Sequence, residues 1–288
     1  MQKVLILVAV IFVLVFNQSA YAHDIKIGLL TNVEKVHLGT STYAPIINSH
    51  TNKSIYILDP MRNYEFKAYN DNILMRVGSK YYTLDTDEIA VRPENGGFVS
   101  AKNKWYRGIF ILKNIGGSLV LINKLDVESY LRGVVPTEMP SSWEFEAHKA
   151  QAVAARSYAY ANLGKRWKYG YDLKDTPEDQ AYNGASAEKE NTNQAVKDTE
   201  GIVIIYDSKI IPAFYSASAG GHTVSAGQVW NHDLPYVRAV PSFDDNVKKN
   251  GHGVGMSQHG ANNLAKQGYY GYQILQYFYK NITFARIK

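Results

Sequence analysis

The sequence of 288 residues contains no cysteine and no long apolar run after residue 16. The missing thiols exclude disulfides, thiol catalysis and zinc sites that use thiolate ligands. A chain of this length can build a core without disulfides, so the absence is compatible with export. Because a membrane-spanning helix needs about 20 apolar residues, no membrane span is expected beyond the N-terminal segment.

Residues 1–22 have the three parts of a secretory signal peptide. Lys3 gives a positive start, residues 4–16 are apolar, and Ala20 and Ala22 are small residues at the positions that a signal peptidase reads. We therefore expect cleavage before His23 and a secreted, extracytoplasmic protein. An uncleaved N-terminal membrane anchor is the alternative.

Charge is nearly balanced, with 31 basic and 26 acidic residues and a net charge of +5. The basic residues form no stripe and no known nucleic-acid motif is present, which excludes nucleic acid as a partner. The small excess fits either weak attraction to a polyanion or an ordinary solvated surface. The histidines lack the tight spacing of metal ligands, so no metal site is expected, nor any cofactor.

Hydrophobic periodicity predicts an α+β protein. Short alternating runs over residues 24–103 predict mainly antiparallel strands, and a hairpin with its turn at residues 114–117 follows. Further elements are predicted from the later pattern: helices at 141–163 and 186–199, strands at 201–206 and 210–215, and a last helix after the N-cap Ser257. We divide the chain into a β-rich region, residues 23–103, and a mixed α/β domain, residues 104–288. In the first helix, Ser141 and Glu144 fit a capping box.

Residues 133–140 read Gly-Val-Val-Pro-Thr-Glu-Met-Pro and place Glu138 between two prolines. Proline fixes its own φ and disfavours helix at the preceding residue. We expect Thr137 and Met139 to be extended and Glu138 to lie outside the helix predicted to begin at Ser141. Apolar neighbours such as Trp143 would raise the pKa of its carboxyl by burial. The alternative is a glutamate that caps a helix or forms a salt bridge.

Two segments rich in small residues follow, at 216–223 and 251–258. Their glycines would let the backbone approach a ligand, and the N–H groups of the helix after Ser257 favour an anionic group. A competing interpretation is a serine hydrolase that uses Ser218. The Gly-x-Ser-x-Gly pattern, however, requires glycine where Ser216 stands.

Five segments, in order, resemble the stage II sporulation protein D (SpoIID) family of peptidoglycan lytic transglycosylases and the related amidase-enhancer proteins. They are residues 130–140, 149–159, 179–184, 213–223 and 251–258. The resemblance implies that residues 104–288 form a SpoIID-type catalytic domain. Such a domain would cleave the bond between N-acetylmuramic acid (MurNAc) and N-acetylglucosamine (GlcNAc) and leave 1,6-anhydro-MurNAc. It also implies a cell-wall location and a role in wall remodelling, including sporulation.

The resemblance implies that Glu138 is the catalytic residue. One carboxylate suffices if the sugar's own C6 hydroxyl attacks C1, because the same group can donate a proton and later accept one. Ordinary glycosidases need two. The matching positions expected to bind substrate are Gln151, Arg156, Tyr158, Gln180, Tyr182, Ser216, Ser218, His252, Ser257 and Gln258. Arg156 either binds the lactyl carboxylate of MurNAc or forms an internal ion pair.

The implied partners are peptidoglycan glycan strands and a cell-wall amidase. A non-catalytic wall-binding protein that enhances an amidase is the main alternative to the enzyme. The chain departs from the family in three ways. Only residues 246–250 separate the Pro-Ser-x-x-Asp segment at 241–245 from the glycine–histidine motif that begins at Gly251, where family members usually have a longer stretch. No cysteine is present for the zinc site of some members, and His148 and His259 stand where large apolar residues are more common.

Overall fold

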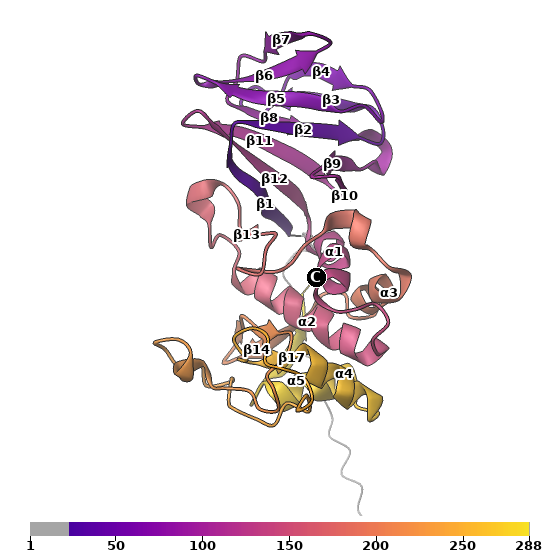
Figure 1. Ribbon diagram of the computed structural model, residues 1–288, viewed down its shortest axis with the longest axis vertical. Helices are drawn as coiled ribbons and strands as arrows, with labels where there is room; N and C mark the ends of the chain where they lie inside the picture. Colours follow the sequence, from indigo (N-terminus) through magenta and orange to yellow (C-terminus); the bar gives the residue numbers. More distant parts are fainter. Residues whose placement is uncertain (1–22, 288) are drawn as a thin grey trace, which may run out of the picture.

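The computed structural model describes residues 23–287, so the predicted signal peptide lies outside the described residues. Figure 1 shows the two large β-sheets at one end of the molecule and helices α1 (Val127–Glu138), α2 (Phe145–Ala161) and α3 (Glu190–Asp198) in the middle. Helices α4 (Gln258–Lys266) and α5 (Gly271–Phe278) lie at the other end. Within residues 23–287 no helix has the length and apolar character needed to cross a membrane.

Two large sheets form the β-rich end. The first has the strand order β13-β1-β12-β11-β8-β3-β4, and the second has the order β10-β9-β2-β5-β6-β7. Only β1 and β13 pair in parallel; the other neighbours in these two sheets are antiparallel, as predicted. The strands are β1 (Asp24–Val33), β2 (Lys35–Thr40), β3 (Ala44–Asn48), β4 (Ser54–Leu58), β5 (Tyr64–Tyr69), β6 (Asn72–Val77), β7 (Lys80–Thr83), β8 (Glu88–Val91), β9 (Val99–Ala101), β10 (Lys104–Tyr106), β11 (Ile109–Ile115), β12 (Ser118–Asp126) and β13 (Leu173–Lys174).

The predicted hairpin is formed by β11 and β12. Its turn uses Gly116 and Gly117, whose φ values of 59° and 83° lie in the left-handed region that glycine tolerates. Because β11 and β12 lie in the same sheet as β1, that sheet extends past residue 103. The domain division at that residue stays a prediction.

The second half of the chain combines helices with short strands, which confirms the α+β class. The helices are α1 (Val127–Glu138), α2 (Phe145–Ala161), α3 (Glu190–Asp198), α4 (Gln258–Lys266) and α5 (Gly271–Phe278), with short 3₁₀ turns η2 (Trp167–Tyr169) and η3 (Gly184–Ala187). A small sheet has the order β15-β14-β18, and β16 pairs with β17 in parallel. These strands are β14 (Ile202–Tyr206), β15 (Lys209–Ile210), β16 (Tyr215–Ser216), β17 (Met256–Ser257) and β18 (Thr283–Arg286).

Helix α1 was not predicted from the sequence; it includes Pro136 and ends with Glu138, which lies outside the following helix α2, as expected. A proline near the end of a helix removes only one backbone hydrogen bond, and the Thr137 hydroxyl donates to the carbonyl of Gly133 at 2.7 Å. Thr137 is therefore helical, and its predicted extended conformation is wrong. Met139, which precedes Pro140, has φ −125° and ψ 138°, as the proline rule predicts.

The predicted capping box at Ser141 is also wrong. Helix α2 begins at Phe145, and Glu144 is its N-cap residue without a side-chain cap bond. The backbone N–H of Glu144 instead donates to Asn262 Oδ1 of α4 at 2.9 Å. The predicted helix at 186–199 likewise starts late, at Glu190, because η3 occupies residues 184–187.

The alanine-rich helix α2 lies between two apolar clusters. Ala152, Ala155 and Ala159 belong to the cluster formed with the β-sheets and α1, whereas Ala147 and Ala154 belong to the cluster formed with α4 and α5. Small side chains on both faces let neighbouring elements approach the helix closely. This packing fixes α1 on one side of α2 and α4 on the other, and the candidate site lies where they meet.

Candidate functional site

A cleft of about 610 Å³ opens where the end of α1, strand β16 and the start of α4 meet. Its walls come from residues far apart in the sequence: Glu138, Tyr158, Lys165, Pro177, Glu178, Asp179, Phe214, Tyr215, Ser216, Ala217, Trp230, His232, Asn250, Gly251, His252 and Gln258. Pairing of β16 with β17 sets Tyr215 beside Met256 and Ser216 beside Ser257. Gln258, the first residue of α4, directly follows Ser257 and lines the cleft together with Tyr215.

The carboxyl group of Glu138 accepts three hydrogen bonds. The backbone N–H of Ala181 donates to Oε1 at 2.7 Å, and the Tyr215 hydroxyl donates to the same oxygen at 3.3 Å. The side-chain amide of Gln258 donates to Oε2 at 3.1 Å. Among residues 23–287 no lysine, arginine or histidine forms an ion pair with Glu138. The carboxyl is therefore held by neutral donors rather than by a cation.

Burial raises the pKa of the Glu138 carboxyl above its usual value, although the three hydrogen bonds lower it in part. The structure thus agrees with the sequence prediction that burial raises the pKa of Glu138. A carboxyl with a raised pKa can remain protonated closer to neutral pH, which general-acid chemistry requires. Oε1 accepts two hydrogen bonds and Oε2 only one, so Oε2 is the oxygen with more room to carry the proton.

A second carboxylate at the cleft, Asp179, has the opposite environment. Its oxygens pair with Lys165 Nζ at 2.6 Å and Arg166 Nε at 2.8 Å, and its side chain is fully buried. Burial opposes ionisation, but hydrogen bonds from Lys165 and Arg166 lower the pKa of Asp179 below its usual value. Asp179 is therefore a paired anion. The sequence did not single it out because its partners become neighbours only in the fold.

Helix α4 begins as predicted. The Ser257 hydroxyl accepts from the N–H of Gly260 at 3.1 Å and donates to Asp244 Oδ2 at 2.6 Å. The glycines before it have different places. A Cβ on Gly255, at φ +75°, would lie 2.1 Å from the carbonyl oxygen of Phe214, so Gly255 lets the loop pack closely against the residue before β16. Gly251 lines the cleft, where the sequence suggested that a ligand approaches.

The predicted substrate-binding residues fall into three groups. Tyr158, Ser216, His252 and Gln258 line the cleft together with Glu138. Gln151, Gln180 and Ser257 are buried behind its wall. The side chains of Arg156, Tyr182 and Ser218 take part in internal contacts elsewhere.

Arg156 forms the internal ion pair that the sequence left as the alternative. Its guanidinium is fully buried, and both Nε and Nη2 donate to the carboxylate of Glu128 at 2.7 Å. Further bonds go to the carbonyls of Val196 and Ile202. A group enclosed in this way has no surface for a substrate carboxylate, so the predicted binding role is corrected to a structural one.

Tyr182 and Ser218 also have internal partners. The Tyr182 hydroxyl donates to Asn123 Oδ1 at 2.8 Å, and its ring packs 4.9 Å from that of Tyr130. The Ser218 hydroxyl donates to the carbonyl of Lys248 at 2.7 Å. A serine nucleophile needs a general base as its hydrogen-bond partner. The contact with a carbonyl therefore gives the serine-hydrolase interpretation no support.

An aromatic wall that the sequence analysis did not identify completes the cleft. The ring of Trp230 lies 4.5 Å from Phe214, 5.3 Å from His252 and 6.2 Å from His232, measured between centroids. Flat rings of this kind pack against the apolar faces of sugars. Phe214 lies in a segment that resembles the family. Nothing local to Trp230 in the sequence indicates its place.

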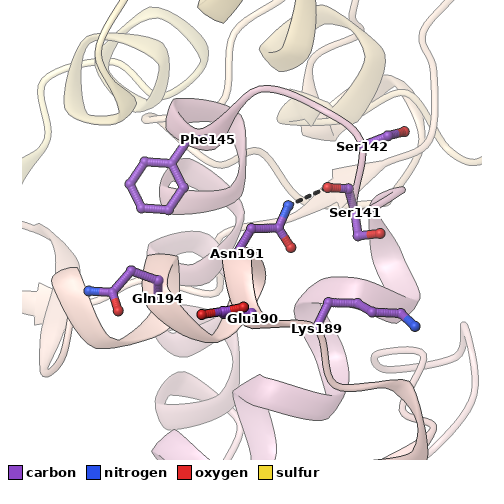
Figure 2. A pocket seen from close by; sticks show the side chains of 7 residues that line it. All are labelled: Ser141, Ser142, Phe145, Lys189, Glu190, Asn191 and Gln194. Atoms are coloured by element: carbon purple, nitrogen blue, oxygen red, sulfur yellow. Dashed lines mark hydrogen bonds between the residues drawn. The ribbon is translucent and has the colours of Figure 1, made fainter.

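A second, shallower depression of about 580 Å³ lies between the loop before α2 and helix α3. Figure 2 shows its lining residues, with the side-chain amide of Asn191 donating to the carbonyl of Ser141. Lys189 and Glu190 are its only charged members. Because no buried titratable group faces it, the cleft at Glu138 is the candidate site.

Comparison with known proteins agrees with this placement. The family model described as SpoIID, stage II sporulation protein, matches residues 116–206, which include Glu138, Asp179 and Gln180. An uncharacterized protein of Brachyspira hyodysenteriae is 32% identical over 208 residues, or 68% of this chain and 56% of that protein.

Two relatives with functional names match shorter stretches. The amidase enhancer of Bacillus subtilis is 44% identical over 115 residues, or 40% of this chain and 15% of that protein. The stage II sporulation protein D of Bacillus amyloliquefaciens is 32% identical over 136 residues, or 42% of this chain and 40% of that protein. The chain thus spans about half or less of the length of these relatives. It carries a domain of the SpoIID family, and the carboxyl of Glu138 lies within that domain.

Proposed function

We propose that this protein is an extracytoplasmic peptidoglycan lytic transglycosylase that cleaves the bond between MurNAc and GlcNAc. The observation that carries the proposal is the state of Glu138 at the cleft. Its carboxyl is largely buried, has a raised pKa and is held only by neutral donors. Such a group can give up a proton and take one back.

In the proposed reaction the proton on Glu138 Oε2 passes to the glycosidic oxygen, and the bond from that oxygen to C1 of MurNAc breaks. The GlcNAc side leaves with a free hydroxyl. The C6 hydroxyl of the same MurNAc then bonds to C1, and its proton returns to the Glu138 carboxylate. No water is consumed, and the catalytic carboxyl ends protonated as it began.

The surroundings of Glu138 fit this use of a single carboxylate. A conventional glycosidase needs a second carboxylate as nucleophile or base. Asp179, the other carboxylate deep in the cleft wall, is already held by Lys165 and Arg166. An anion neutralised by two cations is a poor base. The Trp230 wall supplies a stacking surface for the sugar rings.

A non-catalytic amidase enhancer is the second candidate. The observation that favours it is the stretch of 115 residues that is 44% identical to a protein named amidase enhancer. An enhancer would use the same cleft to hold glycan or to engage an amidase without breaking a bond. Its partner would be a cell-wall amidase.

The two functions are separated by product analysis. The purified protein is incubated with peptidoglycan, both intact and stripped of stem peptides, and the products are analysed by mass spectrometry. The enzyme predicts 1,6-anhydro-MurNAc ends that disappear with Glu138→Gln. Trp167→Ala is a matched control, because Trp167 is 71% exposed and does not line the cleft. Glycan binding without such ends, unchanged in Glu138→Gln, would support the enhancer.

A further inference from the structure

Two glutamine side chains, first Gln258 and then Gln151, lie one behind the other next to the carboxyl of Glu138. Gln258 is 3% exposed, and its Nε2 donates to Glu138 Oε2 at 3.1 Å. The same nitrogen lies 3.4 Å from Oε1 of Gln151, which is fully buried in helix α2. The chain of contacts therefore runs from the carboxyl to Gln258 and from there to Gln151.

The amide nitrogen of Gln151 has no hydrogen-bond partner, although it is buried. An unpaired buried donor is costly, and one beside a candidate catalytic group calls for an explanation. A side-chain amide has an oxygen that accepts and a nitrogen that donates, at nearly equivalent positions. A half-turn about the last side-chain bond exchanges them without moving the rest of the side chain.

The arrangement shown suits ionised Glu138, because Gln258 donates to the carboxylate and Gln151 accepts from Gln258. If Oε2 were protonated, its O–H and the N–H of Gln258 would face each other as two donors, and no acceptor would lie between them. If both amides turn, Gln258 presents its oxygen to the Oε2 proton. Gln151 then presents its nitrogen to the same oxygen, which gives that nitrogen a hydrogen-bond partner.

We infer that Gln151 and Gln258 form a pair of amides that turn together when Glu138 gains or loses its proton, so that both forms of the carboxyl remain hydrogen-bonded. Gln151 is thereby a positioning residue that acts through Gln258 and does not touch substrate. This response rests on geometry alone. Its value for turnover rests on the proposed function, in which Glu138 must exist in both forms.

Other titratable groups surround the same space. They are Tyr130 on α1, Tyr158 on α2, Lys165, Glu178 and Asp179 on the segment that follows, Tyr215 on β16, and His232 and His252 on the loops. Burial raises the pKa of Tyr215 and lowers that of His252. The pKa of His252 is lowered and that of Glu138 is raised, so the two shift toward each other, and the experiment needs a variant that removes Glu138 alone.

The test follows the side-chain amides of the folded protein by ¹⁵N–¹H NMR as pH is raised. The Gln258 and Gln151 resonances should shift with one common midpoint, equal to that of Glu138. Both shifts should be lost in Glu138→Ala, in which His252 still titrates. In Gln258→Met, Glu138 should still titrate while the Gln151 response disappears, because its link to the carboxyl is gone.

Gln151 resonances that do not respond in the wild-type protein would overturn the inference. So would a Gln151 response that persists in Gln258→Met, since it would then reflect the field of the carboxylate through space. Circular dichroism confirms that each variant is folded. The NMR test needs no turnover. If the protein releases no anhydro products, the proposed reaction is refuted, but the amide response of Gln151 and Gln258 can still be observed.

Discussion

The hydroxyl of Tyr215 donates to Oε1 of Glu138 across 77 positions of sequence. Tyr215 in turn accepts a hydrogen bond from Gln180 Nε2 at 2.9 Å, and Gln180 Oε1 accepts from the Tyr130 hydroxyl at 3.2 Å. The orientation of the carboxyl therefore depends on a buried network rather than on one contact. Gln180, expected to bind substrate, is a member of that network.

Removing the Tyr215 hydroxyl should raise the pKa of Glu138. The hydrogen bond stabilises the ionised carboxylate, so its loss in Tyr215→Phe favours the protonated form. The measurement is the Glu138 carboxyl titration by ¹³C NMR, compared between wild type and variant. A Glu138 midpoint that stays fixed or falls in Tyr215→Phe would show that this bond does not tune the carboxyl.

Replacing Glu138 with glutamine should stabilise the fold at neutral pH. A carboxyl whose folded pKa is raised binds its proton more tightly in the folded state. Its contribution to stability is thus present below the unfolded value of about 4.5 and is lost as pH rises through the folded pKa. Each pKa unit between the two states corresponds to about 1.4 kcal/mol.

The check is the free energy of unfolding from urea titrations of wild type and Glu138→Gln between pH 4 and pH 8. The free energy of unfolding of Glu138→Gln should increase relative to that of the wild type as pH rises through that range. A difference that stays constant with pH would contradict the raised pKa.

Breaking the buried ion pair of Arg156 should weaken the fold. In Glu128→Gln the guanidinium loses its carboxylate inside the protein, which costs roughly 3–5 kcal/mol. A matched control is Glu34→Gln, because Glu34 pairs with Lys67 at the surface and is 74% exposed. Thermal unfolding should show a large fall in midpoint for the first variant and almost none for the second. Equal midpoints would restore Arg156 as a candidate for binding substrate.

Loss of the Trp230 ring should weaken glycan binding more than it disturbs the fold. Stacking of this kind contributes about 1 kcal/mol, so Trp230→Ala should bind peptide-free glycan roughly fivefold less tightly. Trp167→Ala should bind as the wild type does, since that ring lies outside the cleft. Affinities come from isothermal titration calorimetry. Equal losses of glycan affinity in both variants would show that the ring of Trp230 is not part of the binding site.

The sequence predicted those features whose causes are local. The hairpin turn at Gly116 and Gly117 follows from backbone conformations that glycine favours, and the start of α4 follows from the capping preference of Ser257. Glu138 was identified from its own segment. The extended conformation expected of Thr137 was wrong because the last turn of a helix can accommodate Pro136, and local rules do not weigh that cost against tertiary packing.

Features that depend on distant residues could not be predicted in the same way. Whether Arg156 faces substrate or Glu128 depends on how α2 packs against α1. Trp230 and Asp179 meet Glu138 only through the pairing of β16 with β17 and the path of residues 163–183. A single sequence does not show which distant residues such side chains will contact, because the fold decides which residues become neighbours.

The central claim is that Glu138 drives an attack by the sugar's own hydroxyl, and digestion of glycan in oxygen-18-enriched water tests it most directly. Mass spectrometry should find 1,6-anhydro-MurNAc ends without the label, because no solvent oxygen enters, and Glu138→Gln should form none. MurNAc reducing ends that carry oxygen-18, or anhydro ends formed equally well by Glu138→Gln, would contradict the account.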